Sequence, residues 1–209
     1  MRIRHKEEEV FKRILAVARQ EFIERGVKKA SIRHIAQLSG VALGSIYKYV
    51  ESKDELLRLV LSPLLDALSG YADLYGTDGK QSLEIFSAYT NPKTTIQEIS
   101  HIVRLYRAEM KLLLFDTAGT SLQDFMARFN DRMASISIRY LKSMGQKYPE
   151  LKTDFSPLLM RIVNSGWNAV LLELSLHAEL DDREIEDIIS GYISFCKGGW
   201  KGLMNVNIE

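Results

Sequence analysis

The sequence predicts an all-α protein, with a small three-helix N-terminal domain followed by a larger C-terminal helical bundle and about nine helices in all. Apolar residues recur at helical spacing along most of the 209 residues. Capping residues and glycine or proline stops separate these periodic segments. No segment shows the period of two that is typical of a half-buried strand. We expect the domains to cover residues 1–53 and 54–209.

The N-terminal domain is predicted from three short patterns. A first helix runs from about Lys6 to Arg25 and ends at Gly26. A second begins after the N-cap Ser31 and ends at Ser39-Gly40, where Gly40 can adopt the positive φ of a sharp turn. A third covers 42–49. Two short helices joined by such a turn predict a helix-turn-helix.

A long connecting helix and the bundle follow. Ser52 is the expected cap of the connector, Glu55 completes a capping box, and Pro63 is expected to kink the helix. Ser156 and the pair Asp181 and Glu184 are the expected caps of the last two helices. The remaining helices are predicted at about 81–89, 95–118, 121–145, 158–177 and 181–204.

Charge is distributed unevenly along the chain, although its net value is only +1. Twelve Lys or Arg and six Asp or Glu occur through Lys53, which leaves sixteen and twenty-one of the 28 and 27 for the rest. A basic N-terminal module joined to an acidic body indicates that the first module contacts nucleic acid.

Several other classes of protein are disfavoured. The single cysteine, Cys196, excludes an internal disulfide, and no apolar run is long enough for a membrane span or signal peptide, so we expect a cytoplasmic protein. The histidines at 5, 34, 101 and 177 form no metal or nucleophile motif. Gly198 to Gly202 lacks phosphate-loop spacing. We therefore predict no enzymatic activity, no metal and no cofactor.

The helix-turn-helix region resembles the N-terminal DNA-binding domain of the TetR family of transcriptional repressors. The matching residues are Ile35-Ala36, Gly40-Val41, the run from Gly44 to Tyr49, and the run from Ser52 to Leu57. Leu43 departs from the family pattern where lysine is frequent, and Val50 departs where an aromatic residue is frequent.

The resemblance implies a double-stranded DNA partner and a set of contact residues. Tyr49 and Lys53 are expected at the phosphate backbone, supported by Lys48, and Leu43 is expected to influence sequence preference. The full expected set is Ser31, Arg33, Ala42, Leu43, Gly44, Ser45, Tyr47, Lys48, Tyr49 and Lys53. Arg2, Arg4 and Lys6 either lie near the DNA backbone or form a solvated tail.

The resemblance also implies a homodimer through the last two helices, a palindromic operator and release by an unknown small-molecule effector. Gly166, Gly198 and Gly199 would let helices approach closely. The expected effector pocket comprises Phe86, Tyr89, Tyr106, Met110, Phe125, Met126, Phe129 and Trp167, unless these residues are plain core. The alternative function is a helical adaptor whose helix-turn-helix contacts another protein.

Overall fold

The structure, a computed structural model of the chain, describes residues 2–76 and 93–206, and the side chains of residues 7–73 and 93–206. Every regular element in this described part is a helix, which confirms the all-α prediction. None of its helices is long and apolar enough to cross a membrane. The helix expected at 81–89 lies outside the described residues.

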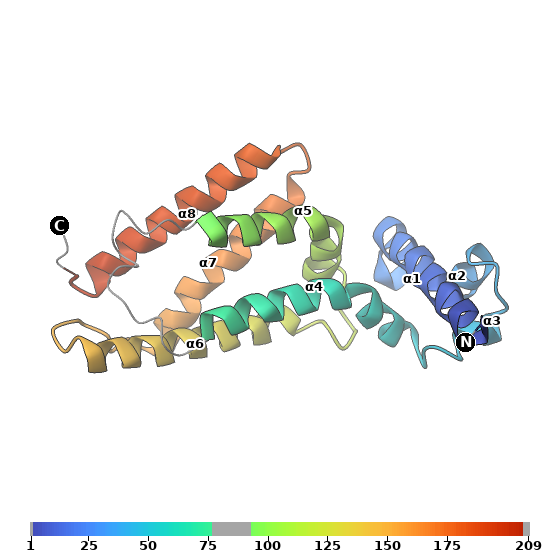
Figure 1. Cartoon of the computed structure of the whole chain (residues 1–209), viewed down its shortest axis with the longest axis horizontal. Helices are drawn as coiled ribbons and strands as arrows, with labels where there is room; N and C mark the ends of the chain where they lie inside the picture. The colour runs from blue at the N-terminus through green and yellow to red at the C-terminus, as the bar shows by residue number, and fades with distance from the viewer. Residues whose placement is uncertain (1, 77–92, 207–209) are drawn as a thin grey trace. The chain divides into compact units, whose positions relative to one another are not determined.

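Eight helices are described (Figure 1). They are α1 (Arg2–Lys29), α2 (Ile32–Leu38), α3 (Leu43–Ile46), α4 (Lys53–Gly76), α5 (Lys93–Phe115), α6 (Phe125–Lys147), α7 (Pro157–Leu176) and α8 (Asp182–Leu203). Helical φ and ψ are interrupted inside α1 at Gly26 and inside α5 at Tyr106. The predicted end of the first helix at Gly26 corresponds to the first interruption, whereas the second was not predicted.

Among the helices whose bounds differ from the predicted ranges, α3 and α6 differ for a visible local reason. α3 is shorter than the expected 42–49, because Ala42 is its extended N-cap and the chain after Ile46 closes in tighter turns. The Tyr49 N–H donates to the Ile46 carbonyl at 2.9 Å, a three-residue step that an α-helix does not make. α6 begins at Phe125 rather than near residue 121, because turns around Thr120 precede it.

The predicted helix caps are formed, except that one of the two capping boxes differs from its prediction. The Ser156 hydroxyl accepts a hydrogen bond from the Leu159 N–H, and Asp181 and Glu184 form a reciprocal capping box. Ser52 caps α4, but Glu55 accepts from the Glu51 N–H instead of the Ser52 N–H that a capping box requires. The carboxylate therefore reaches one residue further back than predicted.

The chain divides into two compact units. Unit 1 comprises the residues up to Ala67 together with Ala108–Phe125, and unit 2 comprises 68–107 and 126–209. Fully buried side chains of unit 1 include Phe22 on α1, Ile35 on α2 and Ile46 on α3, so all three helices contribute to its core. The predicted functional boundary at Lys53 stays a prediction.

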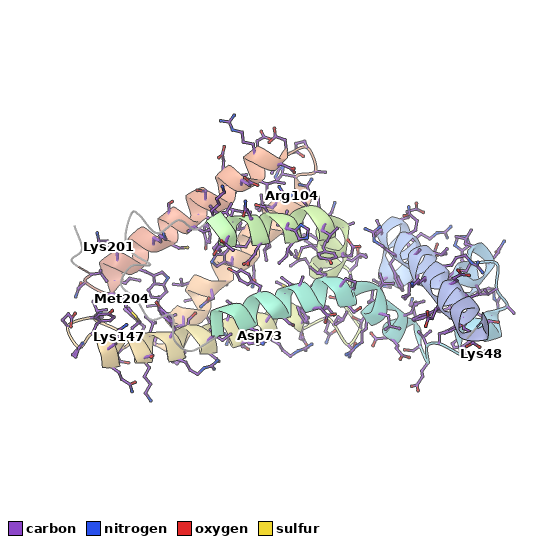
Figure 2. All side chains as sticks on the ribbon, viewed as in Figure 1. Lys48, Asp73, Arg104, Lys147, Lys201 and Met204 are labelled. Carbon is purple, nitrogen blue, oxygen red and sulfur yellow. The ribbon has the colours of Figure 1, made fainter. Side chains whose placement is uncertain are left out.

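Unit 2 contains a core in which the ends of α6, α7 and α8 meet. Leu141, Met144, Met160 and Met204 are among its buried members, and Trp200 packs against them. Figure 2 labels Lys147, the last residue of α6, and Lys201 and Met204 at the end of α8. Helix pairs are further joined by ion pairs, such as that of Arg104 on α5 with Glu186 on α8, which are 3.5 Å apart.

Candidate nucleic-acid interface

The turn between α2 and α3 depends on Gly40, whose φ of 66° lies in the left-handed region that glycine tolerates. The Val41 N–H closes the turn by donating to the Ala36 carbonyl at 3.1 Å. α3 packs against α2, and Ile35 and Ile46 are both fully buried. The predicted helix-turn-helix is therefore formed.

The leading end of α3 is exposed and sterically small. Ala42 and Gly44 are exposed, and no atom of the described residues lies within 4 Å of the position that a Cβ would take at Gly44. Leu43 is 37% and Tyr47 is 52% exposed. Lys48 is also exposed, and Figure 2 shows it at the surface. These five residues, which we call the α3 tip, leave backbone and side chains free to enter a major groove.

Three other predicted contact residues lie at the start of α2 or within α3. Ser31 is exposed, and its hydroxyl accepts a hydrogen bond from the His34 N–H at 3.4 Å, which caps α2. Arg33, in the first turn of α2, is exposed. Ser45 is half-buried within α3. A cap hydroxyl near an accessible helix N-terminus suits a phosphate oxygen, because unpaired N–H groups lie beside it.

Tyr49 has its partners on α1. Its ring stacks on that of Phe11, with centroids 5.0 Å apart and an interplanar angle of 16°. Its hydroxyl donates to the Glu7 carbonyl at 3.3 Å. The side chain therefore fastens the segment after α3 to α1.

Lys53 is likewise engaged within unit 1. Its ammonium donates to the carbonyls of Val27 at 2.9 Å, Ala30 at 3.1 Å and Lys28 at 3.4 Å. These carbonyls lie at the end of α1 and immediately after it, and Lys53 is half-buried there. The side chains of Arg2, Arg4 and Lys6 lie outside the described residues.

A buried carboxylate that sequence reasoning missed connects α1 to α2. Only 1% of the Glu21 side chain is exposed. Its oxygens accept a hydrogen bond from the Ser31 N–H at 3.3 Å, lie 2.7 Å from Nδ1 of His34, and pair with Arg25 at 3.3 Å. The one available signal was a charged residue within the apolar stripe of the first helix, next to Phe22. Glu21 fixes the start of α2 relative to α1.

The segment Ala108–Phe125 contributes further polar contacts to unit 1. Arg19 on α1 pairs with Glu109 on α5, and the Asp54 carboxylate accepts a hydrogen bond from the Ser121 N–H at 2.9 Å. These partners are 90 and 67 residues apart in the chain. Local sequence patterns carry no information on pairings at such separations.

The residues predicted to form an effector pocket are distributed over both units. Met110 is fully buried and belongs to unit 1, as does the half-buried Phe125. The members in unit 2 are all half-buried, namely Tyr106, Met126, Phe129 and Trp167. Phe86 and Tyr89 lie outside the described residues.

Comparison with known proteins identifies the N-terminal part of the chain. Residues 14–60 match the family described as "Bacterial regulatory proteins, tetR family". This range begins within α1, includes the whole α2–turn–α3 region and ends within α4. Residues 14–60 therefore belong to the TetR family of bacterial regulatory proteins.

A curated relative supports this TetR-family assignment. The chain is 29% identical over 121 residues to the HTH-type transcriptional repressor KstR2 of Rhodococcus jostii. The match covers 56% of this chain and 58% of that repressor, so the chain spans little more than half of the relative's length. The matching family and this relative are described as transcriptional regulators and not as enzymes, in agreement with the prediction of no enzymatic activity.

Solved structures of TetR-type proteins share the fold over most of the chain. A putative fatty acid metabolism regulator of Clostridium perfringens matches with a TM-score of 0.64 and 15% identity, covering 88% of this chain and 97% of that one. The ketosteroid transcriptional regulator KstR2 of Mycobacterium tuberculosis matches with a TM-score of 0.59 and 17% identity, covering 93% and 94%. At such identities the likeness establishes the fold of this chain and nothing about its ligand.

Proposed function

We propose that this TetR-family chain is a homodimeric repressor that binds a palindromic DNA operator through the α3 tip and is released by a small apolar effector. The observation that carries the proposal is the exposed α3 tip on a basic N-terminal segment. Leu43 has no hydrogen-bond donor, so it suits a thymine methyl group, while Tyr47 and Lys48 supply polar contacts.

A dimer follows from the size of this surface. One helix-turn-helix contacts too few base pairs for selective binding, and two-fold dimers solve this problem by reading two half-sites. The operator would then be palindromic, with its half-sites separated by a whole number of helical turns.

Exposed apolar faces of α7 and α8 support dimerisation. On α8, Ile188, Phe195 and Leu203 are 43%, 74% and 39% exposed, and their spacing places them on one face. On α7, Leu158 and Ile162 are 66% and 59% exposed and lie one turn apart. Monomeric proteins rarely leave contiguous apolar surface of this kind uncovered.

Glycines on the same face of α8 strengthen the argument. Within the described part of the chain, a Cβ at Gly191, Gly198, Gly199 or Gly202 would meet no atom closer than 4 Å. Gly166 on α7 differs, because a Cβ there would meet the Tyr192 hydroxyl of the same chain at 2.0 Å. Gly166 thus serves the packing of α7 on α8 within one subunit, whereas the α8 glycines remain available to a helix of a second copy.

The names of the similar proteins support an effector with an extended carbon skeleton. One is described as a fatty acid metabolism regulator and another as a ketosteroid regulator. Aromatic and methionine side chains of the predicted pocket, such as Tyr106 and Met126, suit an apolar ligand. The effector acts by binding one conformation of the dimer more tightly than the other.

Selection of bound duplexes from a random pool tests the proposal. We expect enrichment of a palindrome, because a two-fold dimer places two identical α3 tips on the duplex. Long-chain fatty acids and steroid acids are then titrated into the complex, and at least one class should dissociate it. A chain that enriches no sequence is instead an adaptor whose exposed α3 tip contacts protein, and the proposal is wrong.

A further inference from the structure

We propose that Lys53 is a positioning residue that anchors the start of α4 to the end of α1, and that it does not contact DNA phosphate. The inference deepens the proposed function, on which its DNA-binding arm rests. It replaces the role expected for Lys53 from the family resemblance. Its basis is the set of three carbonyl partners of the Lys53 ammonium.

Counting donors and acceptors supports this role. A lysine ammonium has three N–H donors and no acceptor. The carbonyls of Val27, Lys28 and Ala30 lie 2.9, 3.4 and 3.1 Å from Nζ, so each donor has one acceptor. A phosphate oxygen would have to displace one of these carbonyls before it could accept a hydrogen bond from Lys53.

The partial charges at the end of α1 also favour this position of the Lys53 ammonium. The α-helical backbone of α1 is interrupted at Gly26, and Val27 and Lys28 lie in the turn that follows. Carbonyl groups at a helix C-terminus carry partial negative charge, and a lysine that binds them is stabilised there. The ammonium is half-buried at this end, so its charge is offset by the protein rather than presented to a duplex.

The position of Lys53 explains why its anchor matters for binding. Only six residues separate the last residue of α3, Ile46, from Lys53, the first residue of α4. Tyr49 within this interval stacks on Phe11 of α1, and Asp54 accepts a hydrogen bond from the Ser121 N–H. Tyr49 and Lys53 together hold both sides of the α3–α4 connection against α1, and thereby set the orientation of the α3 tip.

Arginine substitution separates the two roles. Lys53→Arg keeps the positive charge, and a phosphate contact tolerates it, but the planar guanidinium fork cannot direct three hydrogens at carbonyls that converge on one point. If Lys53 is an anchor, Lys53→Arg and Lys53→Met both weaken binding of the full chain to its selected duplex by about tenfold or more. Lys48 is the matched control, because it is an exposed lysine of the α3 tip.

The salt dependence of binding provides the decisive readout. Loss of one phosphate contact reduces the slope of log K against log salt by about 0.9. We expect this change for Lys48→Met and an unchanged slope for Lys53→Met. Wild-type affinity in Lys53→Arg, or a slope reduced by about one unit in Lys53→Met, overturns the assignment.

A measurement on the wild-type protein avoids any dependence on the folding of variants. The ammonium protons of Lys53 should exchange slowly with water in the free protein, and the ¹⁵N chemical shift of this ammonium should not change when duplex is added. The ammonium protons of Lys48 should exchange rapidly in the free protein, and the ¹⁵N chemical shift of Lys48 should change on binding. Rapid exchange of Lys53 without DNA overturns the anchor, whereas failure of the wild-type chain to bind any duplex overturns only the proposed function.

Discussion

Nδ1 of His34 lies 2.7 Å from the carboxylate of Glu21, which joins α2 to α1 through a side chain that is almost wholly buried. The same carboxylate receives the Ser31 N–H at the start of α2 and pairs with Arg25. One acidic group therefore serves the three polar partners that meet where the helix-turn-helix joins the first helix. Its removal should affect the region that carries the α3 tip.

Glu21→Ala should lower the free energy of unfolding by about 2 kcal/mol. Breaking a fully buried pair costs about 3–5 kcal/mol, and the value is reduced here because Arg25 and His34 are partly exposed and regain water. Urea denaturation followed by circular dichroism measures the change. Glu24→Ala is the control, because Glu24 is exposed and its removal should change stability by less than about 0.5 kcal/mol. Equal effects of both substitutions would contradict the structural role of Glu21.

Gly166→Ala should destabilise the chain by about 1–3 kcal/mol, the usual cost of overpacking. The new Cβ would lie 2.0 Å from the Tyr192 hydroxyl, which packs α8 against α7. Tyr192→Phe removes that oxygen, so it should recover part of the loss in the double variant, although the ring carbon Cζ remains 3.3 Å away. Thermal denaturation of the two single variants and the double variant measures the coupling.

Gly70→Ala is the control for this helix substitution. A Cβ at Gly70, inside α4, meets no described atom within 4 Å. We expect a neutral effect or a gain of up to about 1 kcal/mol from the higher helix propensity of alanine. Additive effects of Gly166→Ala and Tyr192→Phe would show that the hydroxyl does not limit the approach of α7 to α8.

Phe195→Glu should convert the proposed dimer into monomer. The Phe195 side chain is 74% exposed in one chain, so a charge there leaves the subunit folded but would be desolvated between two copies. Sedimentation at several concentrations measures the state of association. Leu105→Glu is the control, because Leu105 is 52% exposed but belongs to α5 and not to α7 or α8. A wild-type chain that remains monomeric at all concentrations would refute the dimer.

The contribution of His177 to stability should depend on pH. A hydrogen bond to Glu179, followed by its charge and that of Glu173, raises the pKa of His177 above its ordinary value. A hydrogen bond from its own backbone, followed by that from His177, lowers the pKa of Glu179. At pH values between these two pKa values, the imidazole of His177 and the carboxylate of Glu179 are both charged. Nδ1 of His177 lies 2.6 Å from the Glu179 carboxylate.

The sign of this dependence follows from linkage. Because the folded pKa of His177 is raised, its stabilisation is full below about pH 6.5, its ordinary value, and is lost as pH rises through the folded pKa. Because the folded pKa of Glu179 is lowered, its stabilisation is lost as pH falls through that value. Glu179→Gln should therefore lower the melting temperature most near pH 5–6 and least at pH 8. A difference that grows toward pH 8 would contradict the pairing.

The local features of the fold were predictable because their signals lie close together in the chain. Ser156 caps the helix that begins at the next residue, Asp181 and Glu184 cap each other, and Gly40 takes the positive φ that the turn requires. Each depends on contacts over three or four residues. The break in α5 at Tyr106 was not predictable, because no proline or glycine marks it.

The sequence by itself determined the eight described helices, the helix-turn-helix and the basic N-terminal segment. Helical periodicity, caps and charge depend only on residues that lie close together in the chain. Only the tertiary structure decided the partners of Lys53 and Tyr49, which the motif alone would assign to DNA. Their carbonyl and ring partners, on α1 or immediately after it, are 23 to 42 residues away in the chain. Such contacts are decided by how helices pack, and no short pattern encodes them.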